Sequence, residues 1–299
     1  MCSRLASSLF LGVSLALAHS MRTPTRFPTE THRRHDAVCK GVGAASRGNS
    51  FTGLLKPFDF PVLEGGDVYQ FGVFEGGSLR TITRVHDGAR AWGFDSFAGL
   101  PPEELTETQI WQWRAGRFST SLARVASRVS NATTLIPGFF NESLTPKLAA
   151  ASGMRPATYV DIDADLYSSS RQALDWLFSQ RLLVRGSVVG YDDWWALACA
   201  ANSTRVEAHG EPRAHREVTQ KYGARWQCIC GPCVTHQPGV SWGGRTYFAL
   251  LEVGASKAET GFRMSHDDRA LWMRTAASCG VAGKFHILKH ATGRPAAAV

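Results

Sequence analysis

Aspartates follow two apolar segments of this chain, at the point where each segment ends. Residues 157–162 run directly into Asp163, and residues 182–191 run into Asp192 and Asp193. Short β-branched runs predict buried strands of a parallel sheet, and open α/β sheets bind ligands beyond the carboxyl ends of their strands. Carboxylates gathered at such a rim repel one another unless a positive charge lies among them. If the two strands are neighbours, the three aspartates predict a metal site. The alternative for Asp192 and Asp193 is capping of the next helix.

The elements that must position these aspartates alternate along the chain from about residue 67 to residue 253. Such alternation predicts an α/β fold, a doubly wound sheet with right-handed crossovers. We predict strands over 67–71, 89–94, 133–136, 158–162, 182–191 and 245–253, and helices over 78–85, part of 119–129, 144–152, 168–178 and 212–222. At 299 residues and 44% hydrophobic content, the chain can bury one large core.

A glycine-rich loop follows the first predicted strand. Gly72, Gly76 and Gly77 lead into Ser78, which is predicted to cap the next helix. Such a loop lets the backbone approach a ligand and points helix amides at negative charge, although a tight turn is the alternative. Asp95 ends the second strand, where Rossmann-like folds place an acid on ribose hydroxyls; a cap is its alternative. The spacing is that of neither a dinucleotide-binding fingerprint nor a phosphate loop.

The order of these motifs is more informative than any one of them. It resembles the macrocin O-methyltransferase family of class I S-adenosylmethionine-dependent methyltransferases. The resemblance covers about residues 55–253 and is carried by residues 70–78, 93–101, 136–144, 163–170 and 186–194.

The family resemblance implies a Rossmann-like, mostly parallel, seven-stranded sheet flanked by helices, with S-adenosylmethionine over the exit of the first strand. The cofactor-binding residues that it implies are Gln70, Gly72, Gly76, Gly77, Ser78, Asp95 and Ser96. It places the glycines and Ser78 at the methionine end of the cofactor and Asp95 and Ser96 at the ribose. It also implies a divalent ion, usually Mg²⁺, on Asp163, Asp192 and Asp193.

One position departs from the family. The acid usually found two residues before the first glycine is Gln70 in this chain. A neutral amide still forms hydrogen bonds, but it lacks the attraction of a carboxylate for the amino group of the cofactor.

The residues fit one chemistry. Methyl transfer to a hydroxyl needs a deprotonated oxygen held in line with an electrophilic methyl group, and carboxylate-bound magnesium can orient two oxygens and lower the pKa of the acceptor. We predict an O-methyltransferase dependent on S-adenosylmethionine and Mg²⁺, acting on a hydroxyl of a sugar-like or vicinally oxygenated small molecule or glycan. The alternative is a non-catalytic secreted binding domain that retains the methyltransferase fold.

Other side chains have weaker signals. His209 and His215 follow the fifth strand and are the candidates for a general base, with a surface role as the alternative. Asp161 is predicted to be a strand residue, and Asp165 a loop or helix-start residue, rather than ligands. Four tryptophans are candidates for an acceptor pocket, with packing as the alternative: Trp111, Trp113, Trp194 and Trp195.

The cysteines and termini suggest an oxidising compartment. Residues 1–18 resemble a signal peptide, 19–54 a flexible linker, 55–255 the methyltransferase domain and 256–299 a basic extension of unknown role. We expect entry into the secretory pathway and no stable membrane span after leader removal, with a bipartite plastid leader as the alternative. Glycosylation sequons at Asn131, Asn141 and Asn202 agree with secretion. Removal of Cys2 with the leader would leave an even set of six cysteines, which also agrees: Cys39, Cys199, Cys228, Cys230, Cys233 and Cys279.

The cluster Cys228, Cys230 and Cys233 has three interpretations: structural disulfides, a zinc site, or a thioredoxin-type redox pair at Cys230 and Cys233. We favour disulfides, because the segment after Cys233 has the composition of a loop rather than a helix. The net charge of +8 is scattered, without the basic and aromatic pattern of nucleic-acid binders. We therefore expect a small-molecule or glycan acceptor as partner, and no nucleic acid. A homo-oligomer is left open.

Overall fold

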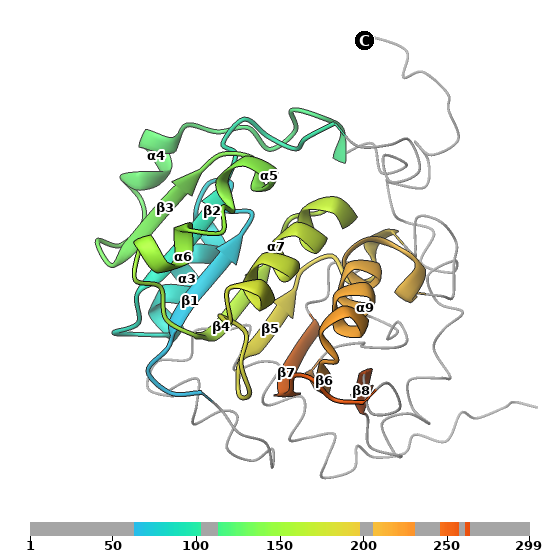
Figure 1. Cartoon of the computed structure of the whole chain (residues 1–299). Coiled ribbons are helices and arrows are strands. Elements are labelled where there is room, and N and C mark those ends of the chain that lie inside the picture. The colour runs from blue at the N-terminus through green and yellow to red at the C-terminus, as the bar shows by residue number, and fades with distance from the viewer. Residues whose placement is uncertain (1–62, 103–112, 198–205, 231–245, 257–260, 264–299) are drawn as a thin grey trace, which may run out of the picture.

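A single sheet organises the chain (Figure 1), and its strand order is β3-β2-β1-β4-β5-β7-β6-β8. The computed structural model describes residues 63–102, 113–197, 206–230, 246–256 and 261–263. The strands are β1 (Asp67–Phe71), β2 (Ala91–Asp95), β3 (Thr133–Pro137), β4 (Ala157–Ile162), β5 (Val188–Tyr191), β6 (Arg225–Cys230), β7 (Thr246–Glu252) and β8 (Gly261–Arg263).

The first five strands are parallel, and β7 runs antiparallel between β5 and β6. This mostly parallel, doubly wound sheet confirms the predicted Rossmann-like α/β architecture. The three-residue strand β8 pairs in parallel with β6 and adds an edge to the seven strands expected. Because the chain passes from β3 back to β4 beside β1, the carboxyl ends of β1 and β4 flank the switch point where such sheets bind ligands.

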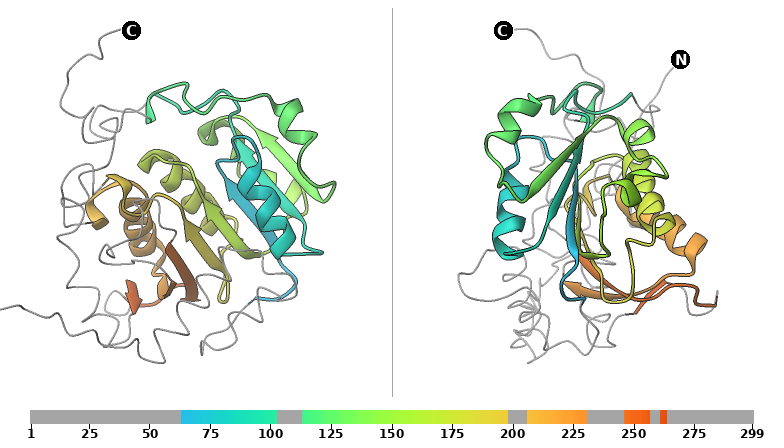
Figure 2. Two further views of the ribbon diagram at one scale, coloured as in Figure 1. Left: turned by 180° about the vertical axis from the view of Figure 1, so that it is seen from behind. Right: turned by 60° about the vertical axis from the view of Figure 1, so that its left-hand side comes forward.

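Helices cover both faces of the sheet. They are α3 (Gly77–Val85), α4 (Leu122–Ala126), α5 (Phe140–Ser143), α6 (Leu148–Ala151), α7 (Tyr167–Ser179), η2 (Val206–Ala208) and α9 (Gly210–Tyr222). The right-hand view of Figure 2 shows α3 and α4 on one side and α7 and α9 on the other. No helix of the described residues is long and apolar enough to cross a membrane.

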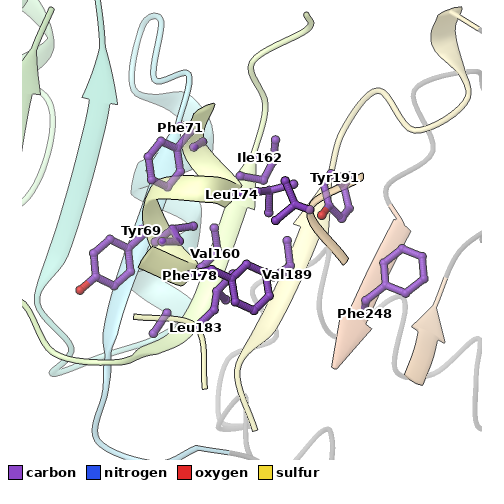
Figure 3. Packing of buried hydrophobic residues seen from close by; sticks show 14 of the residues in the cluster. Tyr69, Phe71, Val160, Ile162, Leu174, Phe178, Leu183, Val189, Tyr191 and Phe248 are labelled. Carbon is purple, nitrogen blue, oxygen red and sulfur yellow. The ribbon is translucent and has the colours of Figure 1, made fainter. Parts of the chain in front are cut away.

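The main core lies between the sheet and α7 (Figure 3). Side chains alternate along a strand, so Tyr69 and Phe71 of β1 pack into this core while Gln70 points to the opposite, α3 face. Val160 and Ile162 of β4 do the same. All five residues of β1 and all six of β4 are buried, as expected of strands covered on both faces.

Several predicted boundaries differ from those observed. Within the range 144–152 predicted as one helix, only α6 is helical; α5 ends before that range, and Pro146 lies between the two. The fifth strand begins only at Val188, because Gly186 at φ 92° turns the chain just before it. Strand β6 was not predicted, although Arg225 to Cys228 alternate between polar and apolar residues. The predicted leader and linker and most of the basic extension lie outside the described residues.

Candidate functional site

A cavity of about 1050 Å³ opens where β1, β2, β4 and β5 end. Its wall contains both predicted groups of functional residues, namely the glycine-rich loop with Asp95 and the three aspartates after β4 and β5. The lining residues from these groups are Gly72, Gly77, Ser78, Asp95, Ser96, Asp163, Asp192 and Asp193. Two predicted cofactor residues, Gln70 and Gly76, are buried behind the wall rather than in it.

The three predicted metal ligands meet at one side of the cavity. Carboxylate oxygens of Asp163, Asp192 and Asp193 all lie within 4.8 Å of one another. Strand pairing brings them together, because Ile162 of β4 is in register with Tyr191 of β5 and each strand is followed directly by an aspartate. Oxygen-only ligands of this charge suit a hard divalent cation such as Mg²⁺. The residues present therefore fit the predicted ion.

Two further acids join this cluster. Asp165, at φ 60°, has a side-chain hydrogen bond with Asp193, and burial together with the Asp163 charge raises its pKa. Glu211 of α9 is fully buried, and its Oε2 accepts a hydrogen bond from the backbone N–H of Asp193 at 3.0 Å. Burial and then the charge of Asp193 raise the pKa of Glu211 as well. Asp165 therefore lies in the loop just before α7, as predicted, and its side chain adjoins the three aspartates without belonging to the predicted ligand set.

Glu211 was missed by the sequence analysis. It follows Asp193 by 18 residues, and no spacing rule links an acid at that distance to a strand-end aspartate. Only the packing of α9 brings the two together.

The glycine loop packs tightly against the exit of β4. Gly72 has φ +88°, and a Cβ atom there would lie 1.7 Å from the carbonyl oxygen of Asp163. Gly76, at φ 78°, is the N-cap of α3, so the helix starts at Gly77 and not after a Ser78 cap. A Cβ on Gly77 would meet nothing within 4 Å, so this position leaves open space at the start of the helix. The first amides of α3 are thereby left accessible to an anion.

Asp95 links the loop after β1 to the loop after β2 through hydrogen bonds to its carboxylate. Its Oδ2 accepts hydrogen bonds from the backbone N–H groups of Val73 (2.7 Å) and Phe74 (2.8 Å), and its Oδ1 accepts one from Phe97 (2.7 Å). The neighbouring Ser96 donates its hydroxyl to the carbonyl of Gly99 at 2.7 Å. Asp95 therefore has the capping role proposed as its alternative, while its carboxylate also lines the cavity and has lone pairs left to accept ribose hydroxyls.

Gln70 lies beneath the loop. Its Nε2 donates to Ser78 Oγ at 2.6 Å and to Asp161 Oδ2 at 3.0 Å. Its Oε1 is buried and accepts no hydrogen bond from the described residues. An orphaned buried acceptor beside an open helix terminus is consistent with a polar ligand completing this site.

The structure corrects the prediction for His215. This side chain is 4% exposed in the core, Nδ1 is hydrogen-bonded to the Tyr191 hydroxyl at 2.7 Å, and burial lowers its pKa to about 3. Its ring packs against Trp194, Trp226 and Phe248 and does not line the cavity. A group so placed cannot take a proton from an acceptor in the cavity. His209 precedes α9, is half-buried and does not line the cavity either.

Other wall residues were not predicted. Arg213 of α9 is the one basic side chain among the described lining residues; its guanidinium lies 4.0 Å from the centre of the Tyr167 ring, and Nε donates to Glu217 at 3.0 Å. Trp113 lines the cavity as predicted, whereas Trp194 and Trp195 are buried elsewhere. The predicted Trp111 lies outside the described residues.

Within the cysteine cluster, Cys228 is the residue whose side chain the structure describes, and it does not line the cavity. Cys228 is 5% exposed and disulfide-bonded. The side chains of Cys230 and Cys233 lie outside the described residues, so the choice between disulfide and zinc for these two stays a prediction.

Comparison with solved structures gives distant fold likenesses. CalS11, a calicheamicin methyltransferase, is 20% identical with a TM-score of 0.45 over 62% of this chain and 72% of that chain. Cofactor-bound Rv0187 from MTB is 17% identical with a TM-score of 0.36 over 75% and 91% of the two chains. An O-methyltransferase family protein from Burkholderia thailandensis is 14% identical with a TM-score of 0.32 over 64% and 52% of the two chains. No family model and no curated protein matches the chain. At such low identities and TM-scores, these likenesses support no conclusion about the chemistry of this chain.

Proposed function

We propose that this protein is an S-adenosylmethionine-dependent O-methyltransferase that uses Mg²⁺ and acts on a hydroxyl of a sugar-like or vicinally oxygenated small molecule or glycan. One observation carries the proposal: a single cavity is lined both by the glycine loop with Asp95 and by the cluster of three aspartates. Taken alone, the glycine loop and Asp95 are explained by a tight turn and a cap, and Asp192 and Asp193 by capping of the next helix. Their convergence at the switch point of this fold favours a shared ligand site.

The two groups of wall residues, the glycine loop with Asp95 and the three aspartates, have different roles in this proposal. When bound, S-adenosylmethionine would supply an electrophilic methyl group for the acceptor oxygen; S-adenosylhomocysteine would be the leaving thioether, and the hydroxyl proton would pass to solvent. The start of α3 and Asp95 would hold the two ends of the cofactor. Asp163, Asp192 and Asp193 would hold Mg²⁺, and with it two vicinal oxygens of the acceptor. Holding the two reactants in line accounts for much of the acceleration expected of such a site.

A titration of the purified protein with S-adenosylhomocysteine, with and without MgCl₂, tests the proposal. We expect saturable binding by calorimetry. An absence of heat from S-adenosylhomocysteine under both conditions would contradict it.

Asp163→Asn tests the metal half. We expect this variant to lose at least tenfold in Mg²⁺ affinity, because removing one charged oxygen ligand weakens a hard cation site. Asp175→Asn is the matched control, because Asp175 of α7 pairs with Lys221 of α9 and does not line the cavity. This variant should bind Mg²⁺ like the wild type. Equal affinities for Mg²⁺ in all three proteins would exclude the aspartate cluster as the metal site.

The neutral Gln70 supports the second candidate, a secreted binding domain without catalysis. Such a domain would retain its ligand in Asp163→Asn, whereas an enzyme would lose its metal-dependent turnover. Assay of methyl transfer to a panel of sugars with the wild type and this variant separates the two.

Secretory localisation is also a proposal. Asn131 and Asn141 are both exposed, as glycosylation requires, but Asn141 lies in the cavity wall, where a glycan would obstruct ligand entry. Expression of the tagged full-length chain followed by glycosidase treatment would reveal the compartment, and a mobility shift lost in Asn131→Gln would support this site.

A further inference from the structure

A line of buried polar side chains runs under α3 to the cavity. The Tyr159 hydroxyl donates to Asp161 Oδ1 at 2.8 Å, Gln70 Nε2 donates to Asp161 Oδ2 at 3.0 Å, and the same Nε2 donates to Ser78 Oγ at 2.6 Å. Asp161 and Gln70 have no exposed surface, while Ser78 is half-buried and lines the cavity. The line therefore connects a carboxylate in the core to a hydroxyl at the ligand surface.

Backbone register builds this line. Gln70 of β1 and Asp161 of β4 are directly paired, so their side chains leave the sheet side by side on the α3 face. Gly190 of β5 makes room for the Tyr159 hydroxyl, since a Cβ at position 190 would lie 2.5 Å from it. Three neighbouring strands are thus adapted to one buried carboxylate, which indicates more than a chance contact.

The hydrogen-bond roles in the line follow from the acceptor at its centre. Both carboxylate oxygens of Asp161 accept hydrogen bonds, so Asp161 fixes the Gln70 amide with its nitrogen toward Asp161 and Ser78. Ser78 Oγ then receives a hydrogen bond from Gln70 and must donate its own proton elsewhere. No group of the described residues accepts that proton, and Ser78 lies in the cavity wall.

We propose that Asp161 is a positioning residue that, through Gln70, turns the Ser78 hydroxyl into a donor facing the cavity. Ser78 and the first amides of α3 then bind the carboxylate of the methionine end of the cofactor. The inference rests on the proposed function. It also gives a role to Gln70: with Asp161 beside it, an acid at position 70 would accept the Ser78 proton and withdraw it from the ligand.

Two ligands that differ only at the methionine end test the proposal: S-adenosylhomocysteine, which has the amino and carboxylate groups, and 5′-methylthioadenosine, which lacks both. We expect Asp161→Asn and Ser78→Ala each to weaken S-adenosylhomocysteine roughly tenfold, as for loss of a hydrogen bond to a charged group, while 5′-methylthioadenosine binds as to the wild type. The double variant should lose no more than either single variant, because both changes remove one contact.

Controls separate positioning from folding. Asp175→Asn changes an acid outside both the line and the cavity wall, and should leave the affinity ratio of the two ligands unchanged. Gln70→Met removes the amide that links Asp161 to Ser78 and should give the same selective loss of affinity for S-adenosylhomocysteine. It therefore tests the proposal if Asp161→Asn does not fold. Melting temperatures of all variants report folding independently.

Equal weakening of both ligands, no weakening, or full additivity in the double variant would overturn the assignment of Asp161. Gln70→Glu provides the sharpest contrast: we expect it to weaken S-adenosylhomocysteine, and tighter binding would also overturn the assignment. If neither ligand binds the wild type, the proposed function fails as well. Binding of both ligands to the wild type with an unchanged ratio in the variants would refute this inference alone.

Discussion

Environment decides what each titratable side chain near the cavity can do. Asp163 and Asp192 are half-buried at the rim, where they can share a cation with Asp193. His215 is a few residues along α9 from Glu211, yet its ring is enclosed by aromatic side chains. Burial of a neutral imidazole opposes its protonation, which makes it a core residue rather than a base.

His215→Asn tests this assignment. Asparagine can keep a polar partner for the Tyr191 hydroxyl but loses the packing of the ring, so we expect the free energy of unfolding at pH 7 to fall by about 2 kcal/mol. Urea denaturation measures it. Affinity for S-adenosylhomocysteine should stay within about twofold of the wild-type value, because a substitution away from the cavity should change the binding free energy very little. Loss of binding with unchanged stability would contradict the core assignment.

The pH dependence of the same pair of proteins gives a second readout. The pKa of His215 is lowered from 6.5 to about 3 in the folded state, so only the unfolded chain takes up this proton between those values. Wild-type stability therefore decreases as the pH falls below 6.5, and His215→Asn lacks that contribution. We expect the stability difference between the two proteins to shrink from pH 7 to pH 5. A constant difference would show that His215 titrates normally.

At the scale of elements, contacts between loops fix the site. The loop after β1 lies against the exit of β4 so closely that only glycine fits at position 72. The start of α3 is set in turn by Gly76, whose left-handed backbone turns the chain into the helix. The cofactor half and the metal half of the cavity are thus joined through the backbone of Gly72 and Asp163.

Gly72→Ala tests this contact against Gly88→Ala. Both glycines have positive φ values, +88° and +79°, but a Cβ at position 88 would meet nothing within 4 Å. Backbone strain alone should lower the stability of Gly88→Ala by about 1 kcal/mol. Gly72→Ala must also displace the Asp163 carbonyl, so we expect a larger loss of stability and weaker Mg²⁺ binding. Thermal melts and Mg²⁺ titrations measure both effects, and equal behaviour of the two variants would contradict the close contact.

Sequence patterns predicted the elements around the site better than those at the far edge of the sheet. The apolar runs of β1 and β4 were recognised because both strands are buried on both faces. Strand β6 was missed although Arg225 to Cys228 alternate between half-buried and buried side chains, because its cysteines were interpreted as candidates for disulfides or zinc ligands. The ends of the predicted strands therefore identified Asp163, Asp192 and Asp193. The position of Glu211 beside them depends on how α9 packs, and no local sequence pattern indicates it.

The whole molecule concentrates its ligand-facing groups at one rim of the sheet. Strands β1 to β5 supply that rim, while β7, β6 and β8 extend the sheet away from it. The antiparallel β7 closes the parallel part and provides Phe248 and Leu250 to the main core. The far strands thus stabilise the fold without contributing a lining residue from the described part of the chain.

This separation predicts where ligands will stabilise the protein. At 100 times its dissociation constant, S-adenosylhomocysteine should raise the free energy of unfolding by about 2.7 kcal/mol, because it binds only the folded state. In hydrogen exchange under native conditions, we expect it to protect residues 72–78 and 95–99, and Mg²⁺ to protect 163–168 and 192–197. Amides of β6 should change little, because local opening at that edge does not involve the cavity. Protection by either ligand that is strongest in β6 would place the binding site elsewhere, since a ligand slows exchange most where its contacts hold the backbone closed.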